Sequence, residues 1–140
     1  SEVFKPIKIL VVDDERAVLD LFSILLSEEG YQLIDFAKNG EEAVKKFKKA
    51  SEKHDLVIMD YRMPVMDGIV AMNNILKIDP RARIIFVSAD NTIKEEALAK
   101  GAKGFLTKPF DVSSLLNAIQ EVKEENNNTE DLPSPSGDRF

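Results

Sequence analysis

The sequence predicts an α/β fold in which helices cover both faces of a doubly wound, five-stranded parallel sheet. Five short apolar runs, rich in the Val and Ile that suit a pleated sheet, alternate along the chain with segments whose apolar residues recur at helical spacing. Such a chain is expected to form a parallel sheet, because right-handed crossover connections leave few other arrangements. The length of 140 residues and the hydrophobic content of 44% suffice for one domain with a core.

The first strand is predicted to end in two acids. Residues 7–14 read IKILVVDD, which is typical of a buried strand. A helix follows and is expected to stop at Gly30, because glycine readily adopts the left-handed backbone found at helix ends. The predicted apolar stripe of this helix consists of Val18, Leu21, Phe22 and Leu25.

The second strand and helix follow directly. Residues 31–37, YQLIDFA, alternate more clearly between apolar and polar side chains and predict a strand. The pair Asn39 and Gly40 is expected to open the next helix. Its predicted inward residues are Ala43, Val44, Phe47 and Ala50.

The third strand, residues 56–60 (LVIMD), is a buried run that ends unexpectedly on a carboxylate. The helix after it carries Ile69, Met72 and Leu76 on one face. It is expected to close near Asp79 and Pro80, because a residue before proline is steered out of the α region.

The last two strands are also short. Residues 84–89 (IIFVSA) predict the fourth strand, and a short helix over residues 93–100 should end at Gly101. Residues 104–108 (GFLTK) predict the fifth strand, and Asp111 is expected to cap the final helix. The predicted stripe of that helix consists of Val112, Leu115, Leu116, Ile119 and Val122.

The C-terminal segment differs in composition from the rest. We expect residues 1–125 to form the domain and residues 126–140 to be a disordered acidic tail rich in Pro and Ser, or a truncated linker. Asn, Pro, Ser, Gly and acids replace the apolar periodicity there, so burial cannot compensate the entropy lost on ordering.

Composition excludes several classes of function. The net charge of -6 disfavours nucleic acid and anionic lipid as direct partners. Without cysteine, and with His54 as the only histidine, any bound metal is expected to have oxygen ligands. The N-terminus does not resemble a signal peptide, and no apolar run approaches the roughly 18 residues that span a bilayer. We therefore expect a soluble, cytoplasmic protein that does not enter the membrane.

Chemically active side chains stand where the predicted strands end: Asp13, Asp14, Asp60, Ser88 and Lys108. In an open parallel sheet, ligands bind outside the carboxyl ends of the strands, so these groups should meet at one edge. Each has a local explanation as well, since acids favour helix N-termini and a serine or lysine is common in turns. The combination on four different strands favours a functional site.

The repulsion between the carboxylates limits which ligands this edge of the sheet can bind. Two carboxylates about 4 Å apart repel by roughly 4 kcal/mol at an effective dielectric of 20, so three of them require a cation. Magnesium suits such a set of oxygen ligands better than calcium. A metal beside a carboxylate, with a lysine opposite, can also hold a transferring phosphoryl group, and Asp60 would then be the nucleophile.

Four motifs in this order and spacing, VVDDE, MDYRMPVMDG, VSA and LTKPF, resemble the receiver domain of two-component response regulators over roughly residues 7–125. The resemblance implies a flavodoxin-like sheet with strand order 2-1-3-4-5. It implies that Asp60 accepts a phosphoryl group from a phosphohistidine on a sensor histidine kinase or phosphotransfer protein. Such a domain is a signalling module that catalyses its own phosphorylation and dephosphorylation, and we do not expect an enzyme with a separate substrate.

The same resemblance assigns the metal ligands. Asp14 is expected to bind Mg²⁺ directly and Asp13 through water, with Asp60 and the main-chain carbonyl of Arg62 completing the protein ligands. Arg62 and Asp90 should flank the phosphorylation pocket, where an ion pair between them would cross its mouth.

The remaining motif residues match the switch of the family. Lys108 corresponds to the lysine that holds a phosphoryl oxygen, and Ser88 to the hydroxyl that follows the phosphoryl group on activation. Phe105 corresponds to the aromatic whose rotamer reports the state. The expected output face is the segment 93–122, which would control a downstream protein or an output domain that the sequence does not identify.

Three alternatives fit less well. A flavin mononucleotide-binding protein would need a phosphate loop where this chain has DDERA, whose carboxylates repel phosphate. A haloacid-dehalogenase-type phosphatase would carry its nucleophile as D-x-D at the end of its first strand. A purely structural receiver-like module would be expected to lack part of the acidic set, which is intact here.

Overall fold

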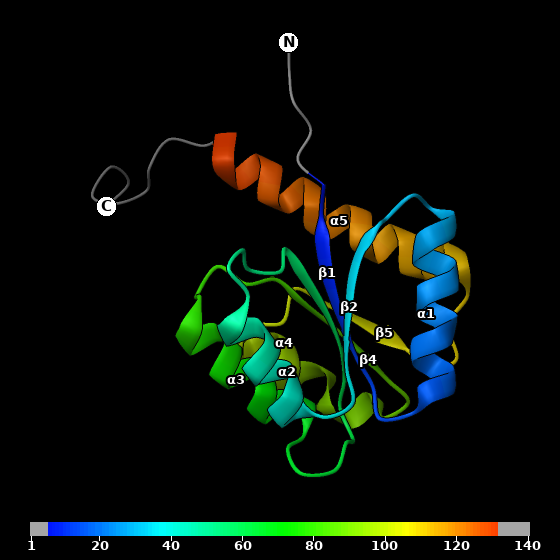
Figure 1. Ribbon diagram of the computed structural model, residues 1–140, viewed down its shortest axis with the longest axis vertical. Coiled ribbons are helices and arrows are strands. Elements are labelled where there is room, and N and C mark those ends of the chain that lie inside the picture. Colours follow the sequence, from blue (N-terminus) through cyan, green and yellow to red (C-terminus); the bar gives the residue numbers. More distant parts are fainter. Residues whose placement is uncertain (1–5, 132–140) are drawn as a thin grey trace.

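The computed structural model describes residues 6–131 and confirms the predicted fold class (Figure 1). The five parallel strands lie in the order β2-β1-β3-β4-β5. This is the flavodoxin-like order expected from the resemblance. The strands are β1 (Lys8–Val12), β2 (Leu33–Ala37), β3 (Leu56–Asp60), β4 (Ile84–Ser88) and β5 (Gly104–Thr107).

The helices form two layers, one on each face of the sheet (Figure 1). Helices α1 (Arg16–Glu28) and α5 (Val112–Asp131) cover one face. Helices α2 (Gly40–Lys49), α3 (Gly68–Ile78) and α4 (Lys94–Ala99) cover the other, and a short 3-10 turn, η1 (Asn91–Ile93), precedes α4. No helix within the described residues is long and apolar enough to span a membrane.

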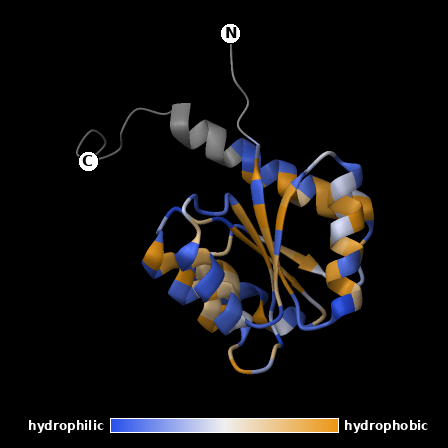
Figure 2. Cartoon of the chain, viewed as in Figure 1, coloured by the Kyte–Doolittle hydropathy of each residue, from blue (hydrophilic) through white to orange (hydrophobic). Residues whose placement is uncertain are grey.

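Both faces of the central strands are buried, which explains why their sequences are apolar without interruption. In β1, Ile9 and Val11 pack against α1 and α5, whereas Leu10 and Val12 pack against the opposite helices. Successive side chains of a strand point to opposite faces, so a strand between two helical layers needs apolar residues at every position. The hydropathy colouring of Figure 2 shows this as strands that are largely apolar between helices with mixed surfaces.

Two glycines end helices as predicted. Gly30 after α1 and Gly101 after α4 have φ values of 95° and 122°, in the left-handed region. At α1, the N–H groups of Gly30 and Tyr31 donate to the carbonyls of Ser27 and Leu26. These bonds satisfy the last carbonyls of the helix and turn the chain toward β2.

The prediction of which face of α1 is buried was wrong, because the buried face is rotated relative to the predicted stripe. Its buried residues are Leu19, Phe22 and Leu26, whereas Leu21 is 47% exposed. The helix sequence RAVLDLFSILLSE has apolar residues in several phases, and packing against the sheet and α5 selects one of them. Val18 and Leu25 lie at the edge of the buried cluster and are partly buried.

Helix α5 begins after Asp111, whose Oδ1 accepts the N–H of Ser114 at 2.7 Å, so the predicted cap is confirmed. The helix continues to Asp131, past residue 125, where we expected the domain to end. Adding residues to an existing helix is far easier than starting one, which explains how a helix can extend into a segment without an apolar stripe. Residues 132–140 of the predicted tail lie outside the described residues.

Candidate functional site

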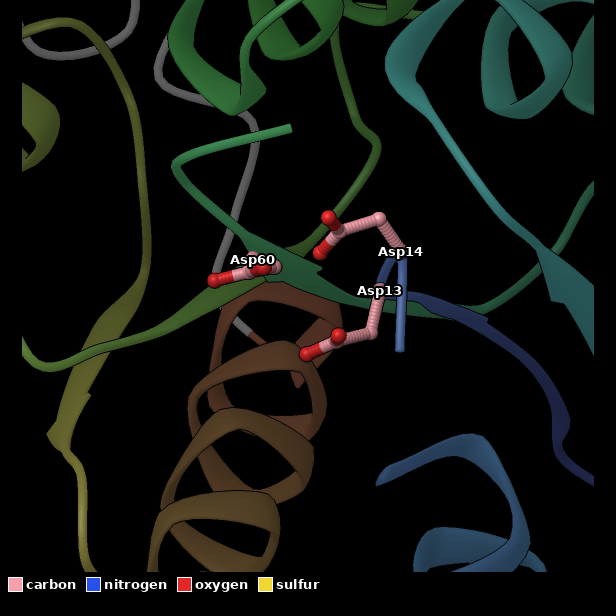
Figure 3. Close-up of side chains that lie close together, drawn as sticks. All are labelled: Asp13, Asp14 and Asp60. Atoms are coloured by element: carbon pink, nitrogen blue, oxygen red, sulfur yellow. The ribbon is translucent and has the colours of Figure 1, made fainter. Parts of the chain in front are cut away.

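Asp13, Asp14 and Asp60 lie together at the carboxyl ends of β1 and β3 (Figure 3). One carboxylate oxygen from each residue lies within 4.8 Å of the others. Asp13 and Asp60 are 2% and 8% exposed, whereas Asp14 is open to solvent. The structure therefore brings together the three acids that the sequence placed at one edge of the sheet.

Two hydrogen bonds fix Asp13, one through its main-chain N–H and one through its carboxylate. Its N–H donates to the carbonyl of Ala37 at the end of β2, at 3.1 Å. Its Oδ1 accepts the N–H of Glu15 at 2.9 Å, which tightens the turn into α1. The position of this carboxylate is thus fixed by the sheet and by the start of the helix.

Lys108 is the cation that faces the buried acids. Its Nζ lies 3.0 Å from Asp13 Oδ2 and 3.4 Å from Asp60 Oδ1. The lysine directly follows β5, so a residue from the edge of the sheet reaches the ends of β1 and β3. One ammonium group cannot neutralise three carboxylates, and the site keeps an excess of negative charge.

Burial raises the pKa of Asp60 from 3.8 to about 6, and the neighbouring charge of Asp13 adds to this increase. Lys108 and the N–H of Tyr61, which lies 2.9 Å from Asp60 Oδ1, oppose it only in part. For Lys108, burial is the largest single effect and lowers the pKa, but its bonds to Asp13 and the charges of both acids raise the pKa overall. The folded chain thus holds a carboxylate under electrostatic stress beside a firmly protonated lysine.

An all-oxygen cluster with this excess charge fits a hard divalent cation such as Mg²⁺. Asp13, Asp14 and Asp60 supply the carboxylates. The main-chain carbonyl of Arg62 stays a predicted ligand. A hollow of about 370 Å³ adjoins the site, and the residues that line it are Asp14, Tyr61, Arg62, Met63, Pro64 and Asp67.

Ser88 ends β4 and is buried, with 3% of its surface exposed. Its Oγ accepts the N–H of Asp90 at 3.0 Å. Asp90 in turn caps the turn η1 by accepting the N–H of Thr92 at 2.9 Å. The hydroxyl therefore belongs to a hydrogen-bonded loop that leads directly into α4.

The predicted ion pair between Arg62 and Asp90 is confirmed. Arg62 Nη2 lies 2.8 Å from Asp90 Oδ2 and joins the loop after β3 to the loop after β4. Hydrogen bonds to Thr92 and the guanidinium of Arg62 lower the pKa of Asp90. Because the Arg62 side chain is largely exposed, the pair adds little to stability.

Phe105 lies in β5, paired with Phe86 of β4. It is partly buried and packs against the core cluster on the α2, α3 and α4 side of the sheet. Phe105 thus belongs to the strand that leads directly to Lys108, and it packs on the side of the sheet that α4 covers.

Gly68 was not among the predicted site residues, although the site needs it. A Cβ atom at this position would lie 2.1 Å from the carbonyl oxygen of Asp60, so no other residue fits without a shift of the backbone. Its N–H also donates to the carbonyl of Tyr61 at 2.9 Å and closes the loop after β3. The Asp-Gly pair before a helix was a signal for a turn, but only the structure shows the close approach to Asp60.

The sequence model of the response regulator receiver domain matches residues 9–120. The chain is 40% identical over 119 residues to the chemotaxis protein CheY of Treponema pallidum, covering 84% of this chain and 83% of that protein. It is also 40% identical over 119 residues to CheY of Thermotoga maritima, covering 84% and 98%.

Two solved structures show the same architecture. CheY of Borrelia burgdorferi, solved with CheX, BeF3 and Mg²⁺, has a TM-score of 0.79 at 38% identity and covers 84% of this chain and 89% of its own. The response regulator TrrA of Thermotoga maritima, in complex with Mg²⁺ and BeF, has a TM-score of 0.75 at 37% identity, with coverage of 83% and 98%.

Proposed function

This chain belongs to the response regulator receiver family, and we propose that it accepts a phosphoryl group on Asp60 from a sensor histidine kinase or a phosphotransfer protein. The observation that carries the proposal is the position of Asp60, buried beside Asp13 and within reach of Lys108. We further propose that residues 1–125 make up the receiver, which passes its signal to a downstream protein or output domain.

In the proposed reaction, a carboxylate oxygen of Asp60 attacks the phosphorus of a phosphohistidine. The new O–P bond forms as the N–P bond breaks, and the imidazole nitrogen keeps the electron pair. With a pKa of about 6, Asp60 is mostly ionised at neutral pH and is a competent nucleophile. Burial also removes part of its hydration shell, so little water has to be displaced before attack.

Lys108 would hold an oxygen of the transferring group. Its ammonium already lies within hydrogen-bonding distance of both buried carboxylates, so it needs only a small movement to bind a third oxygen beside Asp60. Bound Mg²⁺ would supply a positive charge for the phosphoryl oxygens, and Asp13, Asp14, Asp60 and the carbonyl of Arg62 would hold it.

The proposed switch starts from Ser88. A phosphoryl group on Asp60 brings negative charge and new acceptor oxygens, which compete for the hydroxyl that now accepts from Asp90. Movement of this loop would open space for Phe105 to turn inward, and the change would reach residues 93–122 on α4, β5 and α5. This face is where the proposal places the downstream contact.

Labelling with a small phosphodonor tests the chemistry without a partner protein. Acetyl phosphate with Mg²⁺ should add one phosphoryl group to the wild type, detected by intact mass, and none to Asp60→Asn. Asp20→Asn, which changes an exposed carboxylate on α1, should be labelled like the wild type. A label that persists in Asp60→Asn would refute the assignment of the acceptor.

A further inference from the structure

The loop between β3 and α3 contains a backbone conformation that its residue disfavours. Val65 has a φ of 72°, in the left-handed region, and the N–H of Met66 donates to the carbonyl of Pro64 across it at 2.7 Å. This is a three-residue turn of the rare, strained kind. A β-branched residue is especially unfavourable there, because its side chain crowds the backbone.

Burial does not compensate this strain. The Val65 side chain is 75% exposed, more than any other large apolar side chain among the described residues. Glycine would relieve the backbone, and a polar residue would suit the solvent. Neither the local conformation nor the hydrophobic core therefore explains a valine at this position.

Contacts on both sides prevent the loop from relaxing inward. The N–H of Gly68 donates to Tyr61 at the base of the loop, and the N–H of Gly40, the first residue of α2, donates to the carbonyl of Met66 at 3.2 Å. A Cβ atom at Gly40 would lie 2.5 Å from that carbonyl, so α2 and the loop are in close contact. Val65 is thus held outward at the tip of a fixed loop.

The tip lies on the side of the molecule where Asp60 would react. The loop begins directly after Asp60 and extends below the carboxyl ends of the strands in Figure 1, and Figure 2 colours part of its tip as apolar. A protein that brings a phosphohistidine into bonding distance of Asp60 has to cover this edge of the sheet. The tip is therefore well placed for that partner, and it lies outside the segment 93–122 proposed for the output.

We propose that Val65 is a recognition residue for the protein that carries the phosphohistidine, inserting its exposed side chain into an apolar depression beside that histidine. The inference rests on the proposed function, since it needs a protein phosphodonor. Its physical basis is that the strain and the exposure, both unfavourable in the free chain, are offset by burial of the valine in the complex. Holding the residue in one conformation beforehand also lowers the entropy lost on binding.

Phosphotransfer from autophosphorylated histidine kinases of the source organism tests this role. The kinase that phosphorylates the wild type fastest is used to compare Val65→Gly, which suits the positive φ, and Val65→Asn, which tolerates it and is polar. We expect kcat/KM for the kinase to fall by about tenfold in both variants, chiefly through KM, because a contact made in the complex is lost. The rate of labelling by acetyl phosphate should be unchanged, and urea melts should show both variants at least as stable as the wild type.

Leu33→Asn is the matched control, because Leu33 is an exposed apolar residue at the opposite end of the sheet, and it should leave kinase transfer unchanged. Equal transfer to the wild type and both Val65 variants would overturn the inference, as would a defect that appears only in binding of a downstream protein. An equal loss with kinase and acetyl phosphate would also overturn it, because the valine would then affect the chemistry. Failure of the wild type to be labelled on Asp60 by either donor would instead refute the proposed function.

Discussion

The two ends of the sheet differ in how well their charged and polar groups are compensated by neighbouring groups. At the carboxyl ends, the buried acids Asp13 and Asp60 both contact the ammonium group of Lys108. At the amino ends, the buried His54 lies 3.1 Å from Asp35 of β2 and stacks on Phe47 of α2. Beside it, Lys53 Nζ donates to the carbonyls of Phe47, Lys48 and Ala50 at the end of α2.

The described polar residues at the amino ends of the sheet thus stabilise the fold, whereas those at the carboxyl ends form the candidate site. A lysine on the last carbonyls of a helix satisfies groups that would otherwise lack partners and matches the negative end of the helix dipole. Crowded carboxylates do the reverse, since they make the folded state less stable at neutral pH. The amino ends therefore contribute stability, whereas the carboxyl ends hold an excess of negative charge that opposes it.

The largest effect is expected at the amino ends. His54→Ala should lower the free energy of unfolding by about 3 kcal/mol, because it leaves a cavity beside Phe47 and removes the hydrogen bond to Asp35. Urea melts measure this change. His54→Phe keeps a ring against Phe47 and should lose less.

Labelling of the folded fraction of His54→Ala by acetyl phosphate should match that of the wild type. A slower reaction at equal folded concentration would show that the two ends are coupled, contrary to the comparison.

An intermediate effect of opposite sign is expected at Asp60. In EDTA at pH 7, Asp60→Asn should raise the free energy of unfolding by about 2 kcal/mol, because it removes a carboxylate whose pKa is raised from 3.8 to about 6. In the wild type, the stabilising contribution of protonated Asp60 is complete below pH 3.8 and is lost as the pH rises through 6.

The contribution of His54 to stability changes with pH in the opposite direction. Burial lowers the pKa of His54 below 6.5, so its contribution to stability is present above pH 6.5 and is lost as the pH falls through the lowered value. Asp60→Asn, which retains His54, should therefore lose more stability than the wild type between pH 7 and pH 5. Urea melts between pH 7 and pH 5 measure the free energy of unfolding of both proteins. If it changed with pH equally in the two, the raised pKa of Asp60 would be contradicted.

The smallest effect is expected for Asp14, which is exposed. Mg²⁺ at ten times its Kd should stabilise the wild type by about 1.4 kcal/mol if it binds only the folded chain. Asp14→Asn should slightly raise stability in EDTA and lose most of the gain from Mg²⁺. Thermal melts with EDTA and with excess Mg²⁺ measure both, and an Asn variant that is less stable in EDTA would indicate that Asp14 is a structural cap.

Sequence alone was sufficient to predict the fold class and the proximity of the three acids and Lys108. The reason is local: each strand is a short apolar run, and Asp13, Asp60, Ser88 and Lys108 stand at or directly after a strand end. Because the strands are parallel, those ends share one edge, so position along the chain predicts proximity in space.

Tertiary structure decided what depends on distance between segments far apart in the chain. The phase of α1, with Leu19 buried in place of Leu21, follows from packing against the sheet and α5, because its sequence permits more than one apolar face. Likewise, the raised pKa of Asp60 follows from its burial and its approach to Asp13, and the need for Gly68 follows from the carbonyl of Asp60. A pattern of residue types predicts which groups meet, but electrostatic and steric energies change steeply with distance, which only the folded chain sets.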